Sequence, residues 1–379
     1  MQKNSKIAVL GASGLVGSTI TRRLLEKGFN NLIGVYRSRE PDIQKIVQLI
    51  QVDLTNQAAT EEFFKDYQPE YVFLAAAKVG GILANNTYKA DFIYENLAID
   101  VNVIHSAYKY KTKKLLNLGS SCIYPKFAPQ PMKEEHLLTG TLEPTNEPYA
   151  IAKISAIKLC RYFNEQYKTN FISVMPTNLY GIGDNFNLET SHVLPALIRK
   201  FHLAKLLEQG DIEGIKKDFK KYPIGFGLDE KVDYSDEKSI LQTLSVLGIK
   251  IHSSPLTSHV SLTLWGSGEV YREFLYVDDM ADACIYLMEN IDSDKMREFS
   301  DDYFVNIGTG EDIKLKDLAY KIKDMIGFKG EITHDLSKPD GTPRKLLDVS
   351  KINQLGWQYK ISLEEGIRKT YRFYMNNLY

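Results

Sequence analysis

A tyrosine and a lysine stand four positions apart in the run Tyr149-Ala-Ile-Ala-Lys153. On a helix this spacing places both side chains on one face. A tyrosine hydroxyl can protonate a carbonyl oxygen as hydride reaches the carbon, and a nearby ammonium lowers the phenol pKa from ~10. The spacing alone is not specific, because Tyr110 and Lys114 repeat it. Whether this pair is catalytic therefore depends on which other residues the fold places beside it.

A serine-containing turn supplies that context. Residues 119–125, with the sequence GSSCIYP, leave a predicted buried strand at Lys114–Leu118. In a doubly wound sheet the carboxyl ends of the strands line the ligand crevice, so a serine there can hydrogen-bond a carbonyl oxygen. Ser120, Tyr149 and Lys153 together therefore predict the reduction of a carbonyl group.

A glycine-rich turn joins the first predicted strand, Lys6–Leu10, to the first predicted helix, Leu15–Lys27. The turn reads Gly11-Ala12-Ser13-Gly14-Leu15-Val16-Gly17. Gly11 permits the tight turn, Gly14 lets the backbone approach a pyrophosphate, and Gly17 lets helix and strand pack closely. Phosphates then lie at the helix N-terminus, where unpaired N–H groups favour anions. We therefore expect these seven residues to bind a dinucleotide.

The end of the second predicted strand, Asn31–Tyr36, indicates which dinucleotide is bound. Arg37 and Arg39 follow this strand, and guanidinium groups suit the 2′-phosphate of NADPH. Glu40 is an argument for NADH, since an acidic residue there usually holds the ribose hydroxyls. Asp53, after the third predicted strand, could accept a hydrogen bond from the adenine amino group. We expect NADPH to be preferred.

Strands and helices alternate through the first half of the chain. The further predicted strands are Ile46–Val52, Tyr71–Ala76, Lys114–Leu118, Phe171–Met175 and Phe304–Ile307, and the further predicted helices are Asp91–Tyr108, Pro148–Tyr167, Asp278–Leu287, Leu315–Ile326 and Leu363–Met375. This alternation predicts an α/β fold with a doubly wound parallel sheet of the Rossmann type. Residues 203–263 are long, charged and weakly periodic, and they predict either an inserted helical element or a lid.

Composition excludes several classes of protein. The 379 residues include 47 basic and 48 acidic ones, so there is no basic excess of the kind that nucleic-acid binding requires. No apolar run approaches the ~18–20 residues that span a bilayer. The glycine turn begins at Gly11, which leaves no room for a signal peptide, and Cys122, Cys160 and Cys284 are too few for a disulfide framework. We expect a cytoplasmic protein without a metal site.

Longer runs of sequence carry a family resemblance. They are LAAAKVGGI at 74–82, ANNT at 84–87, ADFI at 90–93, GSSCIYPK at 119–126, GTLEPTNEPYAIAK at 140–153, VMPTNLYG at 174–181, DNF at 184–186, WGSG at 265–268, REFL at 272–275, VDDMA at 277–281 and KPDGTPRKLLD at 338–348. With these runs the chain resembles the extended short-chain dehydrogenases/reductases, and within them the GDP-L-fucose synthase family. Enzymes of this family epimerise C3 and C5 of a GDP-4-keto-6-deoxy-sugar and then reduce C4 with NADPH.

The resemblance implies a role for each matching residue. Tyr149 is then the acid for C4 reduction, Lys153 its partner and a ribose ligand, and Ser120 the carbonyl-binding hydroxyl. Cys122 and His192 match the pair that moves protons at C3 and C5. Further cofactor contacts are implied for Leu118, Gly119, Ser121, Pro176, Thr177, Asn178, Leu179 and His192. Substrate contacts are implied for Lys200, Trp265, Arg272, Asp340 and Lys345.

The resemblance also implies an organisation for the whole chain. A NADP-binding Rossmann domain would span 1–177, and a smaller mixed α/β domain for the GDP-sugar would occupy most of 178–379, with some segments returning to the first. A homodimer would form through Asp91–Tyr108 and Pro148–Tyr167. Neither a nucleic acid nor a membrane is an expected partner.

Two departures from the family leave the sugar open. Lys200 stands where the family has an arginine, so the charge is kept but the planar fork is lost. Residues 203–262 form an insertion longer than the family's connection, and it could alter the sugar site or contact another subunit. The substrate could therefore be a 6-deoxy-hexose or a 6-deoxy-heptose, and the enzyme could be a C4 reductase that follows a separate epimerase.

Two other functions compete with this reading. A nucleotide-sugar 4,6-dehydratase would need an acidic pair after Ser120, where the chain has Ser121-Cys122-Ile123. A silent NADP-binding regulator would keep the glycine turn but would not need Ser120, Tyr149 and Lys153 together. Both are less consistent with the sequence than a reductase.

Overall fold

The computed structural model describes residues 1–41, 47–253, 258–338 and 340–378. The chain divides into two compact units, each built from three stretches. The first comprises Met1–Gly183, Glu273–Glu311 and Leu346–Leu363, and the second comprises Asp184–Arg272, Asp312–Lys345 and Glu364–Tyr379. Ile46, where a strand is predicted to begin, residues 254–257 of the insertion and position 339 in the last matching run lie outside the described residues.

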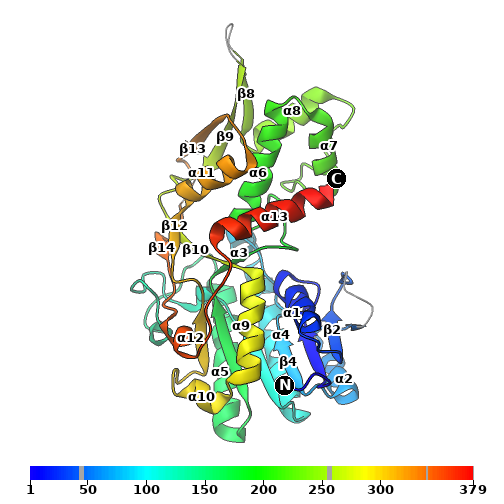
Figure 1. The fold of residues 1–379 in the computed structure, drawn as a ribbon, viewed down its shortest axis with the longest axis vertical. Helices are drawn as coiled ribbons and strands as arrows, with labels where there is room; N and C mark the ends of the chain where they lie inside the picture. Colours follow the sequence, from blue (N-terminus) through cyan, green and yellow to red (C-terminus); the bar gives the residue numbers. More distant parts are fainter. Residues whose placement is uncertain (42–46, 254–257, 339, 379) are drawn as a thin grey trace. The chain divides into compact units, whose positions relative to one another are not determined.

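A seven-stranded parallel sheet forms the centre of the first unit (Figure 1) and confirms the predicted doubly wound fold. Its order is β11-β6-β5-β4-β1-β2-β3, and neighbouring strands are parallel throughout. The strands are β1 (Ile7–Leu10), β2 (Leu32–Tyr36), β3 (Gln48–Gln51), β4 (Tyr71–Leu74), β5 (Lys114–Leu118), β6 (Phe171–Pro176) and β11 (Phe304–Ile307). The order changes direction between β1 and β4, the switch point at which open α/β sheets bind ligands.

Both faces of this sheet are covered by helices, because alternate residues of each strand point to opposite faces. Ile7 and Val9 of β1 join one apolar cluster, and Ala8 and Leu10 join another. Helices α1 (Leu15–Glu26) and α9 (Val277–Asn290) contribute to the first cluster. Helices α2 (Gln57–Tyr67), α4 (Lys89–Lys109) and α5 (Glu147–Tyr167) contribute to the second.

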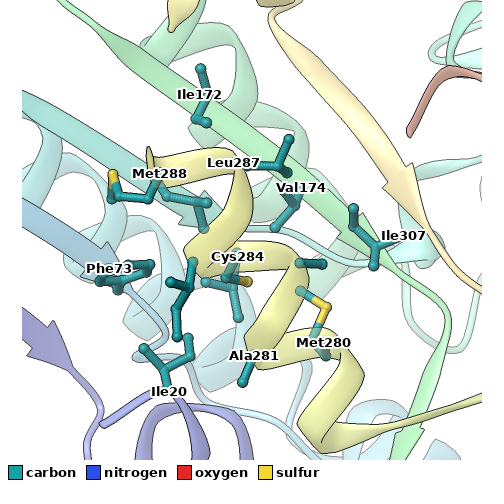
Figure 2. Packing of buried hydrophobic residues seen from close by; sticks show 14 of the residues in the cluster. Ile20, Phe73, Ile172, Val174, Met280, Ala281, Cys284, Leu287, Met288 and Ile307 are labelled. Carbon is teal, nitrogen blue, oxygen red and sulfur yellow. The ribbon is translucent and has the colours of Figure 1, made fainter. Parts of the chain in front are cut away.

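The first cluster joins segments that are far apart in the sequence (Figure 2). Cys284 of α9 lies between Ile20 of α1 and Val174 of β6, with Phe73 of β4 close by. All four side chains are fully buried or nearly so. A helix from late in the chain therefore completes the core of a sheet that is built mainly from early residues.

Several short elements complete the first unit. They are α3 (Ile82–Thr87), the 3₁₀ turns Ser121–Ile123 and Glu134–His136, β7 (Asn178–Tyr180), α10 (Ser293–Arg297) and α12 (Ser350–Gln354). Helix α2 was not expected from the sequence pattern. It begins after Asn56, whose side chain accepts a hydrogen bond from the Ala59 N–H at 3.1 Å and so caps the helix.

The second unit holds a mixed sheet with helices. Strand β9 (Ser258–Trp265) pairs antiparallel with β8 (Ile249–Ser253) and parallel with β13 (Glu331–Asp335). The helices are α6 (Val193–Glu208), α7 (Ile212–Lys221), α8 (Glu237–Val246), α11 (Leu315–Ile326) and α13 (Leu363–Leu378). The short strands β12 (Asp312–Lys314) and β14 (Arg344–Lys345) belong to the sheet of β10 (Tyr271–Tyr276).

The insertion 203–262 is anchored in the second unit by a buried arginine. Arg199 of α6 donates from Nε to Asp218 of α7 at 2.9 Å, and its other nitrogens donate to the carbonyl oxygens of Phe186, Tyr222 and Pro223. The Tyr374 hydroxyl of α13 donates to the same carboxylate. Of the two predicted forms of this segment, the described part is an inserted helical element followed by a hairpin.

Candidate active site

Ser120 and Cys122 lie directly after the carboxyl end of β5. The Ser120 backbone is extended, and its Oγ accepts a hydrogen bond from the Cys122 N–H at 3.3 Å as the chain enters a 3₁₀ turn. The Cys122 side chain is buried. The sheet therefore presents a hydroxyl and a thiol within two residues of each other at the strand end.

Tyr149 lies in the first turn of α5, just after Pro148, which suits a helix start. Its ring packs edge-on against Phe92 of α4, with the ring centroids 6.4 Å apart. In place of the lowering that a nearby ammonium predicts, burial raises the pKa of Tyr149 well above its usual value, and negative charge on Cys122 or Asp100 adds to this shift. The phenol is therefore protonated at neutral pH, as a proton donor must be. Cys122 and Asp100 both lie close enough to Tyr149 to affect its ionisation.

Lys153 lies one helical turn after Tyr149 and forms a buried ion pair. Its Nζ is 3.4 Å from both carboxylate oxygens of Asp100 on α4, and both side chains are almost wholly inaccessible to solvent. Burial raises the pKa of Asp100 to about 6, although the positive charge of Lys153 opposes the shift. Sequence reasoning missed Asp100. The available signal was a carboxylate between Ile99 and Val101, in an otherwise apolar stretch of a predicted helix.

The glycine turn has the close packing that its residue types require. Gly11 has a φ of 88°, and a Cβ there would lie 2.7 Å from the backbone nitrogen of Ala76. A Cβ on Gly17 would lie 2.1 Å from the Gly11 oxygen. A Cβ on Gly14 would contact only the backbone oxygen of Gly11, at 3.4 Å. No side chain forms a capping hydrogen bond at the start of α1. The helix N-terminus is thus left for an anion such as a pyrophosphate.

The residues expected around the adenosine form polar contacts of their own. Arg37 Nη1 donates to Glu95 Oε2 at 2.8 Å, and Lys78 donates to the same carboxylate. Arg39 is exposed. Asp53 Oδ1 accepts hydrogen bonds from the N–H and the hydroxyl of Thr55. Lys78 lies in one of the family-like runs but had no predicted role, and it brings another cation to this side of the unit.

The segment expected beside the nicotinamide is held by a buried glutamate. The Thr177 hydroxyl and the Asn178 amide both donate to the backbone oxygen of Glu273, at 3.2 and 2.8 Å. The Glu273 carboxylate accepts from the backbone N–H groups of Thr309, Gly310 and Leu347. Burial raises the pKa of this carboxyl in spite of those hydrogen bonds. Glu273 therefore has a positioning role that sequence reasoning did not identify.

The other predicted cofactor contacts follow from the strand ends. Leu118 ends β5, and Gly119 and Ser121 come directly after it; Pro176 ends β6, and Leu179 lies in β7. The Gly119 N–H donates to the Val174 oxygen at 2.9 Å, and a Cβ on Gly119 would lie 2.2 Å from the Met175 side chain. A larger residue at position 119 would therefore require the Met175 side chain to move.

His192 and Lys200 belong to the second unit. His192 immediately precedes α6, and partial loss of solvation lowers its pKa. Lys200 lies about two turns further along α6, and burial lowers its pKa to about 8. Its Nζ lies 5.8 Å from the ring centroid of Trp265, the last residue of β9. The structure thus brings together two of the predicted substrate residues, Lys200 and Trp265.

The remaining predicted substrate residues lie on neighbouring strands or beside them. Arg272 of β10 is paired in register with Lys345 of β14. Asp340 accepts hydrogen bonds from both the N–H and the hydroxyl of Ser267, so its carboxylate holds the turn that follows Trp265. This geometry suits a supporting role for Asp340 beside the cationic pair.

The described residues include neither a metal-binding cluster nor a membrane-spanning helix. No group of three or more His, Cys, Asp or Glu side chains there is arranged to hold a metal ion. Within the same residues no helix is both long and apolar enough to cross a membrane.

Comparisons with known proteins identify the family of this chain. The model of the NAD dependent epimerase/dehydratase family matches residues 7–216 and 242–308. GDP-L-fucose synthase 1 of Arabidopsis thaliana is 46% identical over 376 residues, which cover 99% of this chain and 95% of the plant protein.

Two solved structures are similar over 99% of both chains. One is a GDP-6-OMe-4-keto-L-xylo-heptose reductase from C. jejuni, with 41% identity and a TM-score of 0.86. The other is a GDP-mannoheptose C4 reductase from Campylobacter jejuni with NADP bound, with 40% identity and a TM-score of 0.82. The chain therefore belongs to the NAD dependent epimerase/dehydratase family, on the branch that contains the GDP-L-fucose synthases.

Proposed function

We propose that this protein reduces C4 of a GDP-4-keto-6-deoxy-sugar with NADPH, after epimerising C3 and C5. The observation that carries the proposal is the grouping of Ser120, Cys122, Tyr149 and Lys153 where β5 ends and α5 begins. These are the groups that ketone reduction and enolate chemistry need. The names of a relative and of two similar structures describe enzymes that act on GDP-linked sugars, which supports the proposed substrate class.

The first unit supplies the cofactor site in this proposal. The backbone of Gly11–Gly17 and the uncapped start of α1 would hold the pyrophosphate, and Arg37, Arg39 and Lys78 the 2′-phosphate. Thr177 and Asn178, anchored on Glu273, would border the nicotinamide. When bound, NADPH supplies the hydride that the C4 carbon receives. A similar solved structure, the GDP-mannoheptose C4 reductase, contains bound NADP, which supports this choice of cofactor.

Tyr149 is the proton donor for the C4 oxygen. Its raised pKa keeps the hydroxyl protonated until the oxygen becomes basic, and the Ser120 hydroxyl can hold that oxygen in place. The Lys153 ammonium stabilises the phenolate that forms once the proton has left. Asp100 holds this ammonium in the protein interior.

Epimerisation uses the acidity of carbons next to a ketone. C3 and C5 flank the C4 carbonyl, so loss of a proton from either gives an enolate that the same oxygen-binding groups stabilise. In this proposal Cys122 and His192 remove and return those protons from opposite faces of the sugar. The lowered pKa of His192 favours a neutral imidazole, which can accept a proton.

The second unit carries the nucleotide-binding groups. Trp265 offers an exposed ring to the base, and Lys200, Arg272 and Lys345 offer positive charges to the diphosphate. Asp340 fixes the turn after Trp265.

A second candidate function is C4 reduction alone, on a GDP-4-keto-6-deoxy-heptose that another enzyme has epimerised. The observation in its favour is the similarity to two heptose-acting structures, with TM-scores of 0.86 and 0.82. Incubation with NADPH and each GDP-4-keto-sugar in D₂O, followed by NMR of the products, tests both functions. Deuterium at C3 and C5 supports the bifunctional enzyme. NADPH oxidation without deuterium supports the reductase alone, and no oxidation with any GDP-4-keto-sugar overturns both.

We also propose a homodimer formed through α4 and α5. These helices carry exposed apolar side chains, among them Tyr94 and Val101 on α4 and Ile151 and Tyr162 on α5. A second copy would bury this surface. A cytoplasmic location fits the three cysteines, which are all buried and form no disulfide.

A further inference from the structure

An aromatic corner lies in the second unit. The Trp265 side chain is 60% exposed at the end of β9, although indole rings are usually largely buried. The ring of Phe226 lies beside it, with centroids 6.4 Å apart and planes at 60°. Phe226 belongs to the insertion, within residues 217–241, which separate the two segments that the family model matches. The corner thus joins one residue that the family model matches, Trp265, to one that it does not match, Phe226.

The backbone around Phe226 is held in an uncommon conformation. Phe226 has a φ of 56° and stands between Gly225 and Gly227, whose φ angles are 83° and 63°. A bulky residue in this region is strained, and such strain persists only where the surroundings enforce it. The Phe226 N–H donates to Glu189 at 2.6 Å, and the Gly225 N–H donates to Asp229 at 2.8 Å. Glycine would adopt this conformation without strain, whereas Phe226 places a phenyl ring beside Trp265 at a conformational cost.

Two lysine side chains lie beside the indole ring of Trp265. Lys200 Nζ lies 5.8 Å and Lys338 Nζ 5.3 Å from the Trp265 ring centroid. An exposed ring beside two ammonium groups suits a ligand that is both planar and anionic, because a flat base stacks on the indole while phosphates attract the cations. A nucleoside diphosphate has both properties.

The ring geometry excludes a base held between the two rings. Two stacking contacts at ~3.5 Å require rings roughly 7 Å apart and parallel, whereas these planes meet at 60°. A base stacked on Trp265 would instead meet Phe226 along one edge. This edge contact determines how large a base the corner accepts and how it is oriented.

We infer that Phe226 is a specificity-determining residue of the nucleotide site. The guanine base stacks on the Trp265 ring, and Phe226 contacts one edge of that base. The inference rests on the proposed function, which makes a GDP-sugar the substrate. It assigns part of the insertion to nucleotide recognition.

GDP itself is the probe for this inference. The chain has two tryptophans, so quenching of intrinsic fluorescence by GDP, with Trp265→Phe as the reference that loses the signal, reports on the corner. Phe226→Ala should weaken GDP binding about tenfold, since a base–aromatic contact contributes on the order of 1–3 kcal/mol. The KM for the GDP-sugar should rise by a similar factor, while kcat and the KM for NADPH stay unchanged.

Two variants serve as controls. Phe226→Tyr keeps the ring and should bind GDP like the wild type. Tyr234→Ala removes another partly buried aromatic ring of the insertion, which contacts Lys220 rather than Trp265, and should also leave GDP binding unchanged. An unchanged KM for NADPH shows that Phe226→Ala is folded; if that variant does not fold, Phe226→Leu takes its place and should weaken GDP binding in the same direction.

The possible failures are distinguishable. If wild type binds GDP and Phe226→Ala binds it equally well, this inference is overturned and the proposed function stands. If wild type binds no GDP in the presence of NADP, the nucleotide part of the proposed function fails, and the inference fails with it.

Discussion

At the scale of single residues, the phenol of Tyr149 is kept protonated by burial and lies within electrostatic reach of two acidic side chains, Cys122 and Asp100. Such a group donates a proton only when a strongly basic oxygen arrives beside it. In the proposed mechanism, reduction depends on Tyr149 of α5 and epimerisation on Cys122, which follows β5, so different substitutions should affect the two reactions.

Tyr149→Phe should remove the proton donor and slow C4 reduction by ~10²–10⁴-fold. Exchange of the C3 and C5 protons for solvent deuterium should continue, because Cys122 and His192 remain. NADPH absorbance follows reduction, and NMR follows exchange. Tyr162→Phe changes an exposed tyrosine on the same helix and should reduce the ketone normally. Reduction by Tyr149→Phe at the wild-type rate would refute the catalytic assignment.

Cys122→Ser should have the reverse effect. It removes the thiol that moves protons at carbon, so deuterium exchange at C3 and C5 should stop, while a ketone that is already epimerised should still be reduced. The measurement compares exchange by NMR with NADPH oxidation in the same preparation. Continued exchange in this variant would move the epimerase role away from Cys122.

Asp100 should make the free energy of unfolding depend on pH. Burial raises its pKa from 3.8 to about 6, so the stability contributed by the protonated carboxyl is fully present below the unfolded value and is lost as the pH rises through about 6. The difference corresponds to roughly 3 kcal/mol. Asp100→Asn cannot titrate and should lack this fall when urea unfolding is compared at several pH values between ~4 and ~7. Asp91→Asn, an exposed change on the same helix, should follow the wild type. Identical pH slopes for Asp100→Asn and wild type would contradict a buried titrating carboxyl.

The sequence predicts some of these residues and not others for a physical reason. Ser120, Tyr149 and Lys153 stand in local patterns whose spacing already places them on a strand end or a helix face. Asp100 and Glu273 act through partners that are distant in the sequence, so their roles become visible only when helices pack or strands pair.

At the scale of elements, the parallel sheet was predictable because most of its strands are short apolar runs buried on both faces; the edge strand β3 is the exception. Residues 203–262 were not, since charge hides their periodicity. Helix α7 keeps one buried face, with Ile215 and Phe219 beside Asp218. Its place in the unit depends on Arg199, a residue of the preceding helix that no local pattern identifies.

Arg199→Met should therefore destabilise the second unit. It leaves the buried Asp218 carboxylate without its positive partner and three backbone oxygens without their donor, a loss of ~3–5 kcal/mol. Urea unfolding followed by circular dichroism measures the change. Arg368→Met removes an exposed ion pair of α13 and should cost no more than ~1 kcal/mol.

Replacing both buried partners separates charge from packing. The double variant Arg199→Met/Asp218→Leu should recover part of the lost stability, because no uncompensated charge stays buried. If Arg199→Met is as stable as the wild type, the network does not anchor the insertion.

At the scale of the whole molecule, the exposed apolar side chains of α4 and α5 predict a dimer. Light scattering should give about twice the chain mass of 43.2 kDa. Tyr94→Glu combined with Ile151→Glu places charge on this surface and should give a monomer. Tyr320→Glu changes an exposed residue of α11, outside this surface, and should leave the dimer intact. A wild-type mass of 43.2 kDa at assay concentration would refute the dimer.

The first unit is assembled from three stretches of chain, and this has a consequence for its synthesis. Met1–Gly183 supplies six of the seven strands, but α9, which covers one face of the sheet, begins only at Val277, and Trp357 joins the same apolar layer later still. On a ribosome adding ~5–20 residues per second, about 5–20 s separate the emergence of Gly183 from that of Val277. During that interval the nascent chain carries a partly uncovered apolar sheet, a surface that chaperones bind. A gene truncated after Gly183 would make this transient exposure permanent.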